Sequence, residues 1–448
     1  MTTRQSNRTR RAAATVAALA AVTLLAAGCS SGGAPAEQSS SGGGTQDVTI
    51  TVALPTDPPP QAALDAFKQE TGITVTWATS DWDSLQTKIS AAAAANTYFA
   101  DATNVDWSRV GQLGTLGWFL PLEDYLDVES LKAEMPQVAS FAAGGHQVGL
   151  PYDASFMVTT VNTDLFEKAG ITTIPTTIDD YTAALRTIKE KGVVEFPLNI
   201  PFAAAEGLST YWYETTGAFG GTILDGAGKP QFAEPDSPGY KAAEWMIGAL
   251  QDGLVPAGNI NVNDSQGEQT LMAQGLAAST FSDYSGLVGS LYDVEGSSTV
   301  TGKIRYVPTP GVDGPASNLS NPDGIGIPKQ AKNPEAAAKF IEWFTSEQTQ
   351  ADFAGLNGPD KVWGSSFVPS RLSVVQKLAQ AGSLADGEHL AELLKNAKPV
   401  FPDGAPVWYP EFSNAVYTNL HAAAAGDKSA ADAVKAIADE ANRLASGS

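Results

Sequence analysis

Strand and helix patterns alternate along residues 48–107, and this alternation is the strongest constraint on the fold. "DVTITVAL" places four apolar residues on one face, as in a half-buried strand. "PPPQAALDAFKQETG" then has a helical pattern that ends at Gly72, "ITVTWA" alternates again, and "ADATNVDW" is typical of a short strand with a polar end. The pattern predicts the α/β class with mainly parallel sheets, in which ligands bind beyond the carboxyl ends of the strands.

Two later segments carry helix start signals of the same kind. "SPGYKAAEWMIGALQDG" has Ser237 as the N-cap, Pro238 at the first helical position and Gly253 as the stop. "NPEAAAKFIEWF" repeats this arrangement with Asn333 and Pro334. Both segments place apolar residues on one stripe, so we expect amphipathic helices that pack against a core.

The N-terminal segment predicts export. Four arginines precede an apolar run from Ala12 to Ala27, which is shorter than the roughly 18 residues of a membrane-spanning helix, so we interpret residues 1–28 as a signal peptide. "LLAAGCSS" is similar to a bacterial lipobox and contains Cys29, the only cysteine of the 448 residues. We expect Cys29 to be lipidated and to anchor the protein to the outer face of the cell membrane. The alternative is a cleaved signal peptide that leaves a free thiol.

Composition limits what lies beyond this anchor. Residues 29–46 are rich in glycine and serine and predict a flexible tether. The chain has 49 acidic and 27 basic residues, which excludes nucleic acid as a partner because such binding depends on neutralising phosphates. The remaining roughly 400 residues are enough for two or three domains.

Motifs of catalysis and metal binding are absent from the sequence. There is no H-E-x-x-H, and His146, His389 and His421 are scattered. No P-loop or dinucleotide fingerprint follows a strand, and the G-x-S-x-G at residues 28–32 lies across the lipobox. "NINVND" lacks the glycine and glutamate of a calcium loop. We therefore expect no cofactor, no metal site and no enzymatic activity.

Aromatic residues instead stand beside acidic residues in several predicted loops. The segments are "SDWDS", "NVDWSR", "LPYDAS", "STYWYE", "FSDYSG" and "PVWYPE". This combination suits a sugar, whose C–H faces lie against an aromatic ring while its hydroxyls donate to carboxylate or amide oxygens. Tryptophan and tyrosine are also ordinary core residues, so the signal comes from the group of segments rather than from any one of them.

Longer segments resemble the carbohydrate-type extracellular solute-binding proteins (family 1) of bacterial ABC importers, to which maltose-binding protein belongs. They are "ADATNVDWSRVGQLGTLGWFLPLEDYL", "HQVGLPYDASFMVTTVNTDLFEKAGITTIPTTIDDYTAAL", "GAFGGTILDGAGKPQFAEPDSPGYKAAEWMIGALQDGLV", "GIGIPKQAKNPEAAAKFIEWFTSEQTQADFA" and "FVPSR". The resemblance covers nearly all of the chain after the tether. Two departures are Asp283-Tyr284-Ser285, where many members have G-P-W, and Val161, where a tyrosine is common.

The resemblance implies a two-lobed periplasmic-binding-protein fold of type II-like organisation, with a hinge and an interlobe ligand cleft. Matching segments place one lobe at residues 47–156 plus 322–368 and the other at 160–318 plus 372–448. The chain would cross between lobes near Phe156–Val161, Ser317–Gly324 and Phe367–Arg371. Ligand would favour the closed state, which the membrane permease subunits recognise.

The segments and the resemblance together give a set of expected ligand contacts. They are Asp57, Asp81, Trp82, Asp106, Trp107, Asp153, Trp212, Asp283, Tyr284, Asp323, Trp408, Tyr409 and Glu411.

The function predicted from sequence is that of a monomeric substrate-binding lipoprotein that delivers an extracellular sugar, a di- or oligosaccharide, to an ABC permease. Two alternatives remain open at this point. One is a solute-binding protein for a non-sugar ligand such as a polyamine or peptide, which the acidic candidates would suit. The other is a surface glycoside-cleaving enzyme, which would need two carboxyl groups at catalytic separation, one of them with a raised pKa.

Overall fold

The computed structural model describes residues 48–447 except 136, 265, 355–367 and 402–403. The predicted signal peptide, the tether and Cys29 lie outside the described residues. The described part of the chain belongs to one compact unit. No helix within it has the length and apolar character that crossing a bilayer requires.

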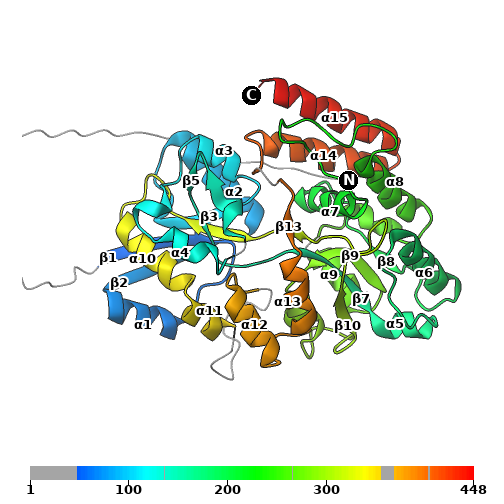
Figure 1. Cartoon of the computed structure of the whole chain (residues 1–448), viewed down its shortest axis with the longest axis horizontal. Coiled ribbons are helices and arrows are strands. Elements are labelled where there is room, and N and C mark those ends of the chain that lie inside the picture. The colour runs from blue at the N-terminus through cyan, green and yellow to red at the C-terminus, as the bar shows by residue number, and fades with distance from the viewer. Residues whose placement is uncertain (1–47, 136, 265, 355–367, 402–403, 448) are drawn as a thin grey trace, which may run out of the picture. The chain divides into compact units, whose positions relative to one another are not determined.

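The first sheet contains five strands in the order β2-β1-β3-β12-β6. β1 pairs in parallel with β2 and β3, whereas β12 runs antiparallel to both β3 and β6 (Figure 1). The strands are β1 (Val48–Leu54), β2 (Ile73–Thr79), β3 (Ala102–Asp106), β6 (Leu150–Pro151) and β12 (Asp323–Gly326).

The second sheet contains four strands in the order β10-β7-β9-β8. They are β7 (Met157–Asn162), β8 (Leu198–Asn199), β9 (Ser279–Tyr284) and β10 (Ile304–Val307). β7 is antiparallel to both β9 and β10, and only β8 and β9 pair in parallel. The expectation of mainly parallel sheets is therefore wrong. β12 joins the first sheet only after the chain has passed through the second, and its direction is not set by a local strand-helix-strand connection.

Helices pack around the two sheets (Figure 1). Those that lie between or after strands of the first sheet in sequence are α1 (Gln61–Thr71), α2 (Trp82–Ala95), α3 (Val110–Thr115), α4 (Val128–Lys132), α10 (Pro334–Phe344) and α11 (Glu347–Phe353). The others are α5 (Thr163–Lys168), α6 (Ile178–Glu190), α7 (Glu206–Ala218), α8 (Pro238–Gln251), α9 (Gln266–Ala273), α12 (Leu372–Gln380), α13 (Gly387–Lys395), α14 (Tyr409–Ala424) and α15 (Ala430–Gly447).

The helix signals in the sequence are confirmed. Ser237 caps α8 by accepting from the backbone N–H of Tyr240, and Gly253, just beyond the helix, has φ of 66°. α10 begins at Pro334 and buries the predicted apolar stripe, although the Asn333 side chain makes no capping hydrogen bond. α1 ends before Gly72, whose φ of 75° suits glycine because it has no Cβ.

Short elements lie between these strands and helices. The remaining strands are β4 (Ala142–Ala143), β5 (His146–Gln147), β11 (Leu319–Ser320) and β13 (Lys398–Pro399), and the short helical turns are η1 (Leu122–Asp124), η2 (Val138–Phe141), η3 (Ala257–Asn261) and η4 (Val288–Tyr292).

The three predicted crossing segments lie beside one another. Phe156 pairs antiparallel with Ser320, and Asp153 pairs with Pro369. The backbone N–H of Ala154 donates to the carbonyl of Val368 at 2.7 Å. This arrangement brings segments more than 160 residues apart in sequence to the ends of both sheets, although the lobe boundaries themselves remain predictions.

Candidate functional site

A cavity of about 470 Å³ lies where the ends of both sheets and two helix starts converge. β1 ends before Pro55, β3 ends at Asp106 and β9 ends at Tyr284, so turns at strand ends supply much of its wall. The lining residues are Pro55, Asp81, Trp82, Asp83, Asp106, Trp107, Ser108, Asp153, Ser155, Ala205, Glu206, Gly207, Thr210, Asn263, Asp264, Gln269, Tyr284, Leu287, Asn321 and Asp323.

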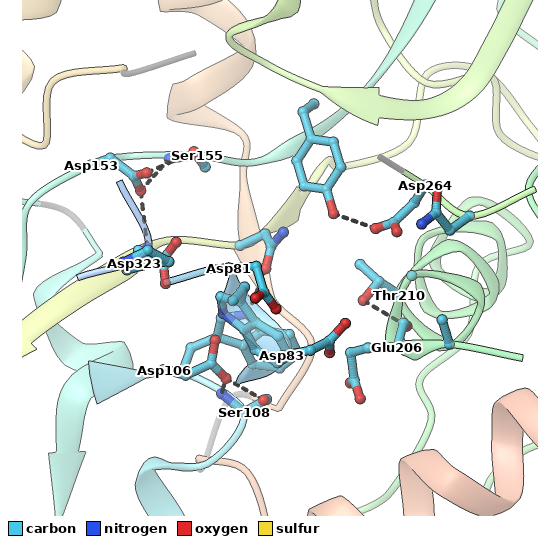
Figure 2. A pocket seen from close by; sticks show the side chains of 18 of the residues that line it. Asp81, Asp83, Asp106, Ser108, Asp153, Ser155, Glu206, Thr210, Asp264 and Asp323 are labelled. Carbon is cyan, nitrogen blue, oxygen red and sulfur yellow. Dashed lines mark hydrogen bonds between the residues drawn. The ribbon is translucent and has the colours of Figure 1, made fainter. Parts of the chain in front are cut away.

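One side of the cavity carries Asp106, Asp153 and Asp323 (Figure 2). Asp106 Oδ1 accepts from the backbone N–H of Ser108 at 2.9 Å and from its hydroxyl. Asp153 Oδ1 accepts from the backbone N–H groups of Asp323 at 2.9 Å and Ser155 at 3.2 Å. Asn104 donates to Asp323 Oδ1 at 2.8 Å. Backbone and amide donors therefore fix the orientation of all three carboxyl groups.

These carboxyl groups also affect one another. Burial raises the pKa of Asp153 to about 6. Burial also raises the pKa of Asp323 well above its ordinary value, and the negative charges of Asp153 and Asp106 raise it further. Burial and the neighbouring carboxylates therefore both disfavour the charged form of Asp323.

The opposite side of the cavity is formed by the start of α7 and by the loop that contains Asp264 (Figure 2). The hydroxyl of Tyr284 donates to Asp264 Oδ2 at 2.5 Å. A Cβ on Gly207 would lie only 2.0 Å from Asp264 Cγ, so this close approach requires glycine. Burial raises the pKa of Asp264.

Arg109 connects the two sides. Its guanidinium lies 3.6 Å from Asp106 Oδ1 and 3.8 Å from Glu206 Oε2, and it stacks 4.4 Å from the centre of the Trp82 ring. Tyr409, which does not line the cavity, donates a hydrogen bond from its hydroxyl to Glu206 Oε1. Burial raises the pKa of Glu206, while the positive charge of Arg109 opposes that shift.

Aromatic rings stand beside the carboxyl groups. Trp82 and Tyr284 are half-buried and line the cavity. Trp107 donates from its indole N–H to Asn321 Oδ1 at 2.5 Å, which fixes the ring against the wall. The cavity thus combines flat apolar surfaces with oriented hydrogen-bond acceptors.

Seven of the thirteen residues expected from sequence line this cavity. They are Asp81, Trp82, Asp106, Trp107, Asp153, Tyr284 and Asp323. Their contact with a ligand remains a prediction, and no group of three or more His, Cys, Asp or Glu side chains in the described ranges is placed to hold a metal ion.

The other six lie away from the cavity wall. Trp212 is 0% exposed, packs edge-on against Phe232 and donates to the carbonyl of Gly239. Trp408 and Tyr409 are buried at the start of α14, and Glu411 is exposed in its first turn.

Asp283 and Asp57 complete this second group. Asp283 is fully buried one residue before Tyr284 and accepts from the hydroxyls of Thr160 and Tyr292. Asp57 is exposed two residues beyond Pro55. Alternation along β9 explains why Asp283 is buried while Tyr284 lines the cavity, because neighbouring side chains in a strand point to opposite faces.

Other lining residues were not predicted. Asp83, Ser108 and Ser155 lie within the quoted segments, next to predicted residues, and could have been found by including each whole turn. Asp264 lies in "NINVND", whose only signal in the sequence is a partial likeness to a calcium loop. Glu206 and Gly207 follow a run of alanines and carry no signal in the sequence.

Comparison with known proteins finds a family model and a relative that are both described as binding proteins. The family model described as bacterial extracellular solute-binding protein matches residues 53–351. A binding protein of Brucella abortus (strain 2308) is 25% identical over 301 residues, which are 65% of this chain and 70% of that protein.

Solved structures share the fold. Maltose-bound T. maritima MalE3 has a TM-score of 0.75 and 22% identity over 89% of this chain and 100% of that chain. An ABC transporter solute-binding protein from Agrobacterium radiobacter K84 in complex with ribitol has a TM-score of 0.75 and 23% identity, over 89% and 99%. One from Agrobacterium vitis S4 with bound D-mannitol has 0.73 and 21%, over 89% and 98%. The predicted two-lobed periplasmic-binding-protein fold is confirmed.

Proposed function

Since this chain belongs to the family of bacterial extracellular solute-binding proteins, we propose that it captures an extracellular carbohydrate and delivers it to the permease of an ABC importer. The carbohydrate would be a di- or oligosaccharide, held in the cavity between the strand ends of the two sheets. No chemical change to the sugar is part of this proposal.

One observation carries the proposal: a single cavity brings aromatic rings and oriented acceptors together from both sheets. Trp82 and Trp107 follow elements of the first sheet, and Tyr284 ends a strand of the second. Sugar rings stack on such surfaces while carboxylate oxygens accept from their hydroxyls. The maltose, ribitol and D-mannitol in the similar structures are polyhydroxylated, which supports the same ligand class here.

Closure of the lobes would follow from contacts that exist only in the closed state. A ligand that touches both Asp106 and Asp264 has more interactions when these residues approach each other, so binding shifts the population towards closure. The closed form would then be recognised by the permease.

The anchor forms part of the same proposal. After cleavage of residues 1–28, lipidated Cys29 would hold a monomer at the outer face of the membrane, and residues 29–46 would act as the tether. Cys29→Ser should release the protein into the medium, as measured by fractionation of cells. Retention of this variant in the membrane fraction would contradict the anchor.

The acidity of the cavity favours a second candidate, a cationic non-sugar ligand such as a polyamine or a basic peptide. Both candidates can be tested by thermal unfolding of the purified protein with mono-, di- and oligosaccharides, polyamines and peptides. A ligand at a hundredfold its Kd should stabilise the protein by about 2.7 kcal/mol. A shift with cations alone would refute the carbohydrate proposal, and a sugar consumed during incubation would show an enzyme.

A further inference from the structure

The cavity has a marked excess of negative charge. Its described lining contains no lysine, arginine or histidine. Seven acidic residues line it: Asp81, Asp83, Asp106, Asp153, Glu206, Asp264 and Asp323. Arg109, which is not part of the lining, is already shared between Asp106 and Glu206. Neutral hydroxyl groups would hydrogen-bond to these carboxylates but would leave the excess charge in place.

One carboxylate oxygen of Asp106 has no hydrogen-bond donor among the described residues. This residue is 4% exposed, lines the cavity and receives both donors of Ser108 on Oδ1. No donor in the described part of the chain lies within hydrogen-bond distance of its Oδ2, which points away from Ser108 in Figure 2. Because Asp106 lines the cavity, a ligand donor could reach this oxygen and form a charge-assisted hydrogen bond there.

Asp153 and Asp323 lie on the same side, and among the described residues neither of them forms an ion pair with a cation. Asp153 accepts from backbone N–H groups and Asp323 from Asn104, all of which are neutral donors. The negative charges of Asp106 and Asp153 raise the pKa of Asp323, so the three groups act on one another electrostatically. A positive charge among them would relieve this repulsion.

The kind of cation follows from the donors it must supply. A primary ammonium group has three N–H donors and can serve three acceptors at once. The hydroxyl of Ser155 and the amide of Asn321 border the same side and suit the hydroxyls of a sugar.

We propose that the carbohydrate taken by this cavity is an amino sugar, whose protonated amine lies among Asp106, Asp153 and Asp323 while its rings stack on Trp82 and Trp107. This inference rests on the proposed function and specifies its substrate class. A simple polyamine would satisfy the carboxyl groups but would make no use of the hydroxyl and amide groups along the wall.

Matched ligands test the inference. Calorimetric titration would compare glucose with glucosamine, and cellobiose with the β-1,4-linked dimer of glucosamine. Within each pair the only difference is that every ring has an amine in place of one hydroxyl. Spermidine serves as the cation without a sugar. A hydrogen bond to a charged group contributes about 1.5–3 kcal/mol, so the amine should strengthen binding about tenfold to a hundredfold.

Proton release gives a second measurement, which needs no variant. An ammonium group lowers the pKa values of Asp153 and Asp323, so amine binding should release protons and should strengthen as pH rises through about 6. The heat of binding would then depend on the ionisation enthalpy of the buffer. A neutral sugar should show no such release.

Asp323→Asn tests the position of the amine. The variant keeps the shape and the hydrogen bond from Asn104 but removes one charge, so it should abolish most of the preference for the amine. Asp313→Asn is the matched control, because Asp313 is an exposed acidic residue outside the cavity lining. The control should keep the preference.

Each outcome has a distinct meaning. Equal or tighter binding of the neutral partners would overturn the inference and leave the proposed carbohydrate function intact. Binding of spermidine but of no sugar would refute both the carbohydrate function and the amino-sugar inference. Ligands that bind without any preference for the amine would overturn the inference. An amine preference that survives in Asp323→Asn would refute the assigned position.

Discussion

The segments "NVDWSR" and "STYWYE" contain the same kinds of residue, yet their tryptophans have opposite environments. Trp107 lines the cavity and hydrogen-bonds to Asn321, whereas Trp212 is buried in the core and hydrogen-bonds to Gly239. The acidic residues differ too, because Asp106 borders the cavity and Glu214 is enclosed by protein. A tryptophan beside a carboxylate is thus no sign of a ligand site by itself.

The difference follows from the element on which each segment lies. β3 ends at Asp106, so Trp107 stands in the turn at the strand end, where the sheet opens to the cavity. "STYWYE" lies within α7, which packs against α8, α14 and β9, so that nearly all its side chains are buried. Only the first turns of α7 reach the cavity, through Glu206, Gly207 and Thr210.

The largest effect expected from this comparison is on folding. Trp212→Ala should lower the free energy of unfolding by about 3–5 kcal/mol, because it removes a fully buried ring and leaves a cavity beside Phe232. Urea unfolding measures this change. A loss below about 1 kcal/mol would contradict the assigned burial. A loss of ligand affinity without loss of stability would place Trp212 in the ligand site.

Trp82 should show the reverse behaviour. Trp82→Ala should weaken ligand binding about tenfold to a hundredfold, because the half-buried ring lines the cavity and offers one face to a sugar while Arg109 covers the other. Calorimetric titration with the ligand found by screening measures this effect.

Trp343→Ala is the matched control for Trp82→Ala. Trp343 is also half-buried, but it packs against Phe67 and Phe340, away from the cavity lining. This control should lose stability and keep its affinity. Equal affinity losses in the two variants would argue against stacking on Trp82.

Glu214 and Glu206, two acidic residues of the same helix, should differ in how they make stability depend on pH. Burial raises the pKa of Glu214 to about 8, and it accepts from the hydroxyl of Thr309 at 2.9 Å and the backbone N–H of Leu319 at 2.7 Å. Between about pH 4.5 and pH 8, the Glu214 carboxyl group is protonated in the folded state but ionised in the unfolded state, where its pKa is about 4.5. Stability therefore falls as pH rises from about 4.5 to about 8 and levels off above.

Glu214→Gln should remove this part of the pH dependence. Relative to the parent, the variant should gain up to about 1.4 kcal/mol of unfolding free energy per pH unit within that range. Urea unfolding across the range measures the difference. Glu206→Gln is the control and should change the slope less, because Arg109 opposes the effect of burial on Glu206. A steeper effect at Glu206 would contradict the assigned environments.

The sequence predicts the architecture better than the site. Strand alternation, Pro238 and Pro334 at helix starts, and Gly72 at a helix end are local signals, and the structure has these elements where they were predicted. The direction of β12 and its pairing with β3 are not local, because they depend on the chain returning from the second sheet.

The site was predicted where residues follow strands and missed where the signal depends on tertiary packing. Asp81, Asp106 and Asp153 lie at or just beyond the ends of β2, β3 and β6, and the structure brings them to one cavity. Trp212 and Trp408 were predicted because each stands in a segment with aromatic residues close to a glutamate, and both are buried in the core. Glu206 and Asp264 could not be recognised, because their place at the cavity depends on how α7 packs rather than on neighbours in sequence.

Arg109 lies where the segment "NVDWSR" meets α7, and its substitution tests how strongly these two regions depend on each other. It closes "NVDWSR" and contacts Glu206, which begins the helix that contains "STYWYE". Arg109→Gln should lower the free energy of unfolding by about 1 kcal/mol or less, because partly exposed ion pairs contribute little. Lys435→Gln, which removes an exposed pair with Asp439 on α15, should change it by still less. A loss of several kcal/mol would instead show that Arg109 is essential for holding the two regions together, and Trp107 and Trp212 would then depend on each other rather than on their own elements.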